Sequence, residues 1–300
     1  GKWVTKGNVV YQNEEKFRHY AKYFYYFFSK TSLVQAKDSK TAPFVQEAFE
    51  YSKKYAYSIE EDLKKRFIIT MTSTCNAIKN SCDELDEEVD LETIRNVAES
   101  HLFNILFVKS CEVRRVLPIS STQYLRLSLH EVVETMDAMH FDPDKDWDDF
   151  LRDFRFTFGK KFDWDGFEIF NRFINLYEII HDGTAKTKDF GFEIEGFKES
   201  IFSKKEWKFA KTHKINNKRM VEIIFHLSFI ESSFSGRRYQ QIPYSYFTSR
   251  QLGSIYESFL EYQLEVADTD IVFHKGMWSK ANLSSSKVKS LKLVDSHICK

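Results

Sequence analysis

A run of aspartate side chains between residues 142 and 153 has the composition of a calcium-binding loop. A calcium loop binds its ion through carboxylates at alternate positions, but it also needs a glycine at its sharp turn and a glutamate at its last ligand position. The run in this chain has neither, and acidic residues at the start of a helix are favoured by the helix dipole. We therefore expect a loop and a helix start here, and no metal site. The run comprises Asp142, Asp144, Asp146, Asp148, Asp149 and Asp153.

Two further patterns share residue types with catalytic sites but lack the spacing that those sites need. Pro143-Asp144 and Glu206-Trp207-Lys208 match the nuclease pattern PD-(D/E)xK, in which carboxylates hold a metal and the lysine orients the attacking water. That chemistry needs both parts at one sheet edge, whereas here they are far apart in a helix-rich sequence. The nine histidines lack the HExxH spacing of a zinc site. We expect no catalytic, cofactor-binding or metal-binding residue in this chain.

Basic residues are concentrated in the last third of the chain, although the net charge is zero. Residues 203–300 contain 16 lysines and arginines against 9 aspartates and glutamates. Cations that share a face can neutralise the phosphates of double-stranded DNA, and Trp207 and Tyr239 lie among them. The other interpretation is a solvated lysine-rich surface, because no groove-reading motif accompanies the charges. The candidate nucleic-acid-binding residues are Lys204, Lys205, Lys208, Lys211, Lys214, Arg237 and Arg238.

The elements that would position these residues are mostly predicted to be helices. Apolar residues recur at steps of three and four, which is typical of amphipathic helices. The longest predicted helix, 43–81, would be on the order of 55 Å long if unbroken, which suits a spacer between two domains. Asp90 is placed to cap the helix that follows it, and Pro118 to end that helix. The predicted helices are 14–29, 43–81, 90–117, 122–139, 147–158, 166–181, 218–234 and 249–265.

The end of the chain shows a different pattern. Segments 271–273 and 288–294 have the composition of strands and predict a hairpin, while the glycines of 183–202 predict a loop. The expected fold is mainly α, an irregular multi-helix bundle with one long helix and a small C-terminal β-hairpin. We expect a helical domain over 1–267, with a sub-division near 118–145, and a hairpin segment over 268–300.

The composition favours a cytoplasmic protein with no membrane partner. Its hydrophobic content of 42% is enough for a sizeable core. No apolar run is long enough to span a membrane, and no signal peptide precedes the first charged residues. Cys75 and Cys82 fall on one face of the long predicted helix, which favours core packing over a zinc site or a disulfide framework.

The helix predicted over 249–265 has a distinctive amino-acid sequence. Ser249 stands where a cap would lie, and Gly253 predicts that another backbone packs closely against this turn, because glycine otherwise costs helix stability. Its LGSIYESFLEY resembles the LG-IYE-LLE segment just upstream of the methyltransferase domain in bifunctional type IIG restriction-modification enzymes and related adenine-specific DNA methyltransferases.

Two more segments resemble the same family, in the same order. FVQEAFEYSKKYAYSIEEDLKKR at 44–66 looks like the family's helix with a YA-x-x-x-x-EDLK core. HLFNILFVKSCEVRRVLP at 101–118 is similar to the family's LLFLLYAEARGLLP helix. The interval 183–202 departs from the family, because it lacks the Asn-Gly-Gly of the family's YNGGLF segment.

The resemblance implies that this chain is a non-catalytic helical connector between an upstream nuclease and a downstream methyltransferase. Residues 268–300 would lead toward the methyltransferase domain, and we expect the chain to be a piece of that longer enzyme. The parent enzyme would methylate adenine in DNA using SAM, and would cleave DNA with Mg²⁺. The glycine-containing SAM loop and the NPP-aromatic segment that such methylation needs are not found in these 300 residues.

Two alternatives belong to other classes of protein. The parent could be a phage-exclusion DNA methyltransferase without a nuclease, because the helical region looks alike in both. The chain could instead be a stand-alone helical scaffold that binds a protein partner through an aromatic surface.

Overall fold

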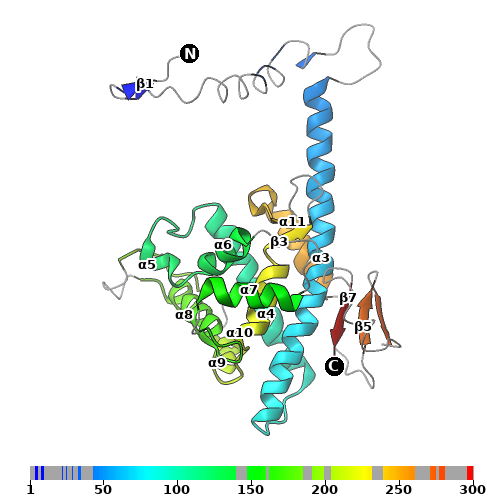
Figure 1. Ribbon diagram of the computed structural model, residues 1–300, viewed down its shortest axis with the longest axis vertical. Helices are drawn as coiled ribbons and strands as arrows, with labels where there is room; N and C mark the ends of the chain where they lie inside the picture. Colours follow the sequence, from blue (N-terminus) through cyan, green and yellow to red (C-terminus); the bar gives the residue numbers. More distant parts are fainter. Residues whose placement is uncertain are drawn as a thin grey trace. The chain divides into compact units, whose positions relative to one another are not determined.

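The computed structural model describes residues 4–5, 8–9, 22, 25, 29, 33–34, 43–139, 147–159, 162–184, 191–198, 204–231, 239–260, 271–274, 277–280 and 296–299. The fold is mainly α, as predicted (Figure 1). The chain forms two compact units, Gly1–Ser58 and Ile59–Lys300. The predicted sub-division of the helical domain near 118–145 and the predicted boundary between that domain and the hairpin segment after residue 267 stay predictions.

The first unit contains a small sheet and the start of a long helix. Strand β1 (Val4–Thr5) pairs antiparallel with β2 (Asn8–Val9). The backbone N–H groups of Ser29 and Leu33 donate to the carbonyls four residues earlier, which is the hydrogen-bond pattern of a helix. The rest of the predicted helix 14–29 lies outside the described residues, apart from two isolated positions.

Helix α3 (Phe44–Glu84) is continuous and close to the predicted 43–81. From Ile59 onward its apolar stripe is buried. Cys75 and Cys82 are buried thiols, which confirms the predicted core packing, and burial raises the pKa of Cys75 to about 12. Among the described residues, no helix is both long and apolar enough to cross a membrane.

Helix α4 (Leu91–Val113) ends before the predicted position 117. Arg115 takes a left-handed φ of 57°. The N–H of Val116 donates to the Cys111 carbonyl at 2.9 Å, and the N–H of Arg115 donates to the Glu112 carbonyl at 3.0 Å. This is a Schellman motif, which closes the last turn of the helix. The helix therefore stops at this turn and not at Pro118.

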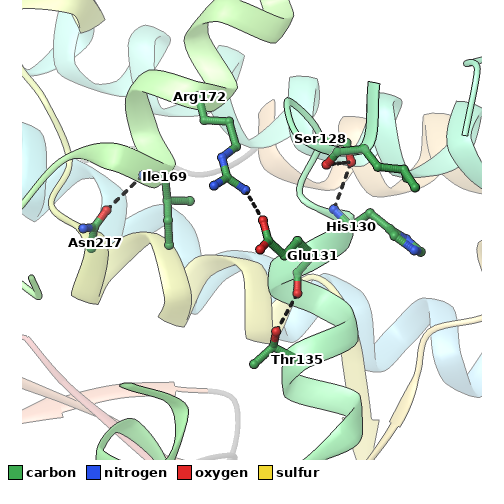
Figure 2. Close-up of polar contacts among 8 residues, drawn as sticks. Ser128, His130, Glu131, Thr135, Ile169, Arg172 and Asn217 are labelled. Carbon is green, nitrogen blue, oxygen red and sulfur yellow. Dashed lines mark hydrogen bonds and ion pairs between the residues drawn. The ribbon is translucent and has the colours of Figure 1, made fainter. Parts of the chain in front are cut away.

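Helices α7 (Trp147–Phe158) and α8 (Glu168–Asp182) match the predicted 147–158 and 166–181. The predicted helix 122–139 is instead two helices, α5 (Thr122–Leu125) and α6 (His130–Ala138). Ser128 Oγ accepts the His130 N–H at 3.2 Å, as Figure 2 shows. Because that N–H would bond to a backbone carbonyl in a continuous helix, the serine side chain supports the break.

An ion pair joins α6 to α8. Arg172 Nη1 lies 2.9 Å from Glu131 Oε2, and Glu131 also presents its carbonyl to Thr135 Oγ1 within α6 (Figure 2). The Arg172 side chain is about three-quarters covered, whereas that of Glu131 is more than half exposed. The pair therefore orients the two helices and contributes little stability on its own.

The predicted helix 218–234 is only half correct. Helix α10 (Asn217–His226) is followed by strand β3 (Phe229–Glu231), which pairs antiparallel with β4 (Tyr239–Gln241). The apolar run through this region fits either a buried helix or a buried strand, so periodicity could not separate them. Helix α9 (Lys204–Thr212) was not predicted.

The C-terminal hairpin is present and gains a third strand. Strand β5 (Ile271–His274) lies between β6 (Met277–Lys280) and β7 (Ser296–Cys299), and both pairings are antiparallel. The hairpin partner of β5 is thus 277–280. The predicted strand 288–294 lies outside the described residues.

The two predicted caps have different outcomes. Asp90 Oδ1 accepts the Thr93 N–H at 2.8 Å, which confirms that cap. Helix α11 (Ser249–Leu260) is capped by Thr248, whose Oγ1 accepts the Gln251 N–H at 3.3 Å while Gln251 Oε1 accepts the Thr248 N–H at 2.9 Å. This reciprocal pair is a capping box, so the prediction of Ser249 as the cap was wrong. The sequence alone did not distinguish the two positions, because Thr248 and Ser249 both carry a hydroxyl group.

Among the described residues, close backbone packing occurs at Gly183 and Gly196 and not at Gly253. A Cβ on Gly183 would lie 2.7 Å from Gly196 N. In the part of the chain that the structure describes, nothing lies within 4 Å of a Cβ built on Gly253, so that prediction was wrong. The N–H of Thr184 donates to the Ile194 carbonyl at 2.9 Å and joins the start of the predicted loop 183–202 to its middle.

The centre of the second unit is an aromatic cluster around His101 of α4. The rings of Phe170, Phe173 and Tyr177 of α8 lie 5.4, 6.0 and 5.8 Å from its ring. Tyr177 OH donates to the His101 carbonyl at 3.0 Å. Burial lowers the pKa of His101 to about 3, so the imidazole is neutral in the folded protein.

Candidate nucleic-acid interface

Helix α9 and the residues directly after it, up to Lys214, carry the part of the predicted basic set that the structure describes. The helix packs against α4 and α8 through one face, where Ala210 is buried, and leaves Lys208 and Lys211 exposed. Lys204 and Lys205 begin this helix, but the structure does not describe their side chains. Arg237 and Arg238 lie outside the described residues. A face shared by all seven cations therefore stays a prediction.

Residues 204–214 are called the basic segment below. Some of its lysines already contact a carboxylate or an aromatic ring of the same chain. Lys211 Nζ forms an ion pair with Glu178 of α8. Lys214 Nζ lies 5.9 Å from the centre of the Phe167 ring, at the outer range of a cation–π contact. Lys208 is exposed and makes no ion pair with the described residues, so its charge is available to an external phosphate.

His213 ends this helix and connects it to a different part of the fold. Its ring stacks on Phe209 with centroids 4.0 Å apart, and its side chain is 3% exposed. Its Nδ1 lies 3.2 Å from the Phe209 carbonyl oxygen, and its Nε2 lies 3.1 Å from Glu87 Oε2. Glu87 belongs to the acidic loop between α3 and α4. Local sequence patterns do not predict this contact, because the two residues are far apart along the chain.

Asn217 fixes the start of α10 against α8. Its Oδ1 accepts the Ile169 N–H at 3.0 Å (Figure 2), and its Nδ2 donates to the Asp163 carbonyl at 2.6 Å. Its neighbour Asn216 caps α10 by accepting the Arg219 N–H at 3.0 Å. This arrangement places Lys218 on the exposed surface that follows the α9 cations. Arg219 Nη1 is held by Glu222 Oε2 at 2.7 Å, so its charge is already compensated.

A second group of titratable side chains lies on α4 and α5, and sequence reasoning did not identify it. Tyr124 OH donates to Glu112 Oε1 at 2.8 Å. Burial raises the pKa of Glu112 and that of Tyr124. Burial also lowers the pKa of Lys109 to about 8, against the opposing effect of Glu112. The hydrogen bond and the buried surroundings indicate a structural polar cluster.

The structure gives no support to a metal centre within its described range. There, no group of three or more His, Cys, Asp or Glu side chains could hold a metal ion. Asp149 of the carboxylate run pairs with Arg152 of the same helix, whereas residues 142–146 lie outside the described part. Comparison of the chain with protein-family models, with curated proteins and with solved structures finds no match.

Proposed function

We propose that these residues form the helical connector of a restriction-modification enzyme, which holds an upstream nuclease and a downstream methyltransferase. The parent enzyme transfers a methyl group from SAM to the amino group of adenine in DNA. In this proposal the connector supplies no reacting group, because SAM and Mg²⁺ are bound by the flanking domains. Its own part is positioning, with contacts to the DNA backbone from the basic segment.

The packing of two of the family-like segments, 101–118 and 249–265, against each other and against α3 is the observation that carries the proposal. Phe67, which directly follows segment 44–66 on α3, lies 5.0 Å from Phe103 of α4 between ring centroids. Phe103 in turn lies 4.5 Å from Tyr256 of α11. Two segments that are widely separated in sequence and resemble one family thus meet in an aromatic contact chain, which continues to α3 one residue after the third such segment. Such contacts are expected where the segments belong to one structural unit.

A backbone contact supports the same grouping. Arg114, in the RRVLP end of segment 101–118, donates from Nη2 to the carbonyl of Phe247, just before α11 begins. Ile255 of α11 is fully buried, whereas Tyr256 remains 43% exposed. Helix α11 is therefore anchored through one face and still presents a partly apolar surface. A domain that follows this helix would have a defined surface on which to pack.

The complete open reading frame that encodes these residues tests the proposal. We expect a glycine-containing SAM loop and an NPP-aromatic segment downstream, and a nuclease domain upstream. A methyltransferase without a nuclease would identify the phage-exclusion class. A reading frame without a methyltransferase would overturn the connector proposal and favour the stand-alone interaction scaffold.

Contact with DNA is tested separately, by fluorescence anisotropy on a labelled duplex. Replacing Lys204, Lys208 and Lys211 by glutamine should weaken binding and reduce the salt slope by about 0.9 for each of these lysines that neutralises a phosphate. Replacing Lys53, Lys54 and Lys65, which are exposed on α3, removes the same number of charges as a matched control and should change little. If the unmutated chain has no affinity for the duplex at low salt, the connector is a spacer without a DNA contact.

A further inference from the structure

The loop between α3 and α4 carries a dense negative charge on the surface. Its carboxylates are all exposed. Two of them have structural roles, because Asp83 pairs with Lys79 and Asp90 caps α4. The others make no ion pair within the described residues, apart from the contact of Glu87 with His213. The acidic residues of the last turn of α3 and of the loop that follows it, together called the loop 83–90, are Asp83, Glu84, Asp86, Glu87, Glu88 and Asp90.

The backbone fixes where this loop points. Asp86 takes a left-handed φ of 56° just after α3 ends. The N–H of Glu87 donates to the Cys82 carbonyl at 3.0 Å, and the N–H of Asp86 donates to the Asp83 carbonyl at 3.2 Å. This Schellman motif turns the chain sharply at Asp86. Because Asp90 then starts α4, the loop is held at both ends.

The loop meets the basic segment at His213. Glu87 Oε2 lies 3.1 Å from His213 Nε2, and the histidine stands between Lys211 and Lys214 in sequence. The contact is internal to the second unit, where α9 also packs on α4. A second carboxylate, Glu178 of α8, forms an ion pair with Lys211. Carboxylates from two different elements therefore reach this segment, Glu178 at Lys211 and Glu87 at His213, which directly precedes Lys214.

We propose that the loop 83–90 is an intramolecular competitor that reduces the affinity of the basic segment for DNA. This inference rests on the proposed DNA contact of that segment. Carboxylates within about 10 Å of a cation lower the local positive potential at moderate ionic strength. Binding of a DNA phosphate must overcome that effect, so the loop restricts the connector to DNA that is also held by the flanking domains.

The test compares duplex binding by the unmutated chain and by the variant Asp86→Asn/Glu88→Gln, using anisotropy at low salt. Both side chains are exposed, and asparagine tolerates the left-handed conformation at position 86. We expect the affinity of the variant to rise about three- to tenfold. The gain should disappear when Lys208 and Lys214 are also replaced by glutamine.

The matched control removes two carboxylates elsewhere, through Glu134→Gln/Asp137→Asn on α6, which is drawn well apart from α9 in Figure 1. We expect a much smaller change from this control. Equal gains from both variants would show a general charge effect and overturn the proposal. So would the absence of binding by the unmutated chain and the loop variant alike, and that result would leave the connector proposal to be judged on the reading frame.

Discussion

The ring of Tyr256 meets the ring of Phe103 at an angle of 65°, with centroids 4.5 Å apart. The two residues lie on α11 and α4. They belong to two of the segments on whose sequence resemblance the connector proposal is based. An edge-on aromatic pair of this kind contributes about 0.5–1.5 kcal/mol beyond the apolar area that it buries. It is the direct physical link between two parts of the proposed connector.

A double-mutant cycle on this pair measures the link. Phe103→Ala should lower the free energy of unfolding by about 3–5 kcal/mol, because this ring is 8% exposed. Tyr256→Ala should cost less, since its side chain is half solvated. The coupling energy from urea unfolding should be about 0.5–1.5 kcal/mol. Additive effects of the two changes would show that the rings do not interact in solution.

Asn217 is predicted to stabilise the junction of α8 and α10. Asn217→Ala removes the acceptor of the buried Ile169 N–H and should cost about 1–3 kcal/mol. Asn217→Asp keeps that acceptor but places a carboxylate against the Asp163 carbonyl and Glu168, so it should cost at least as much. Hydrogen exchange at the Ile169 amide distinguishes the two variants. Unchanged protection of that amide in Asn217→Ala would contradict the assignment.

His101 is predicted to make stability depend on pH. Burial lowers its pKa from 6.5 to about 3. Above the unfolded value both states are neutral, and below it the unfolded chain takes up a proton that the folded chain does not. The unfolding free energy should therefore fall by about 1.4 kcal/mol per pH unit between about pH 6 and pH 4.

The control for this prediction is His101→Gln, which lacks the titrating group. Urea unfolding of both proteins across that pH range isolates the histidine contribution as a difference of slopes. A slope for the unmutated protein that is no steeper than that of the variant would show that His101 is protonated in the fold.

Arg115 offers a stabilising substitution. Its φ of 57° strains a residue with a side chain, so Arg115→Gly should raise the unfolding free energy by about 0.5–1 kcal/mol. The matched control is Arg126→Gly, because Arg126 follows α5 with an ordinary φ of −67°. That change should lower stability by a similar amount. A loss of stability in Arg115→Gly would mean that the Schellman turn does not form.

The strongly periodic segments were predicted best from the sequence. Helix α7 matches its prediction, and α3 differs at its ends only, because a wide apolar stripe specifies a helix almost regardless of its surroundings. The end of α4 depends on a backbone dihedral at Arg115, and the start of α11 depends on a choice between Thr248 and Ser249. Composition reveals neither, and residues 261–265 of the predicted helix lie outside the described residues. Periodicity could not show that β3 would find a partner in β4.

The candidate site was predicted in part. Lysines of α9 were identified from local charge density, and Lys208 and Lys211 are indeed exposed. The ion pair of Lys211 with Glu178 and the contact of His213 with Glu87 required the tertiary structure, because those carboxylates come from distant elements. Charge density in sequence thus locates cations but does not show how much of their charge is available.

Methyl transfer by the product of the complete reading frame tests the central proposal most directly. The assay measures incorporation of tritiated methyl groups from SAM into adenines of duplex DNA, with the 300-residue chain measured alongside. We predict incorporation by the complete protein, and neither methylation nor cleavage by the 300-residue chain with SAM and Mg²⁺. Methylation or cleavage by that chain alone, or no methylation by the complete protein, would contradict the assignment of these residues as a connector.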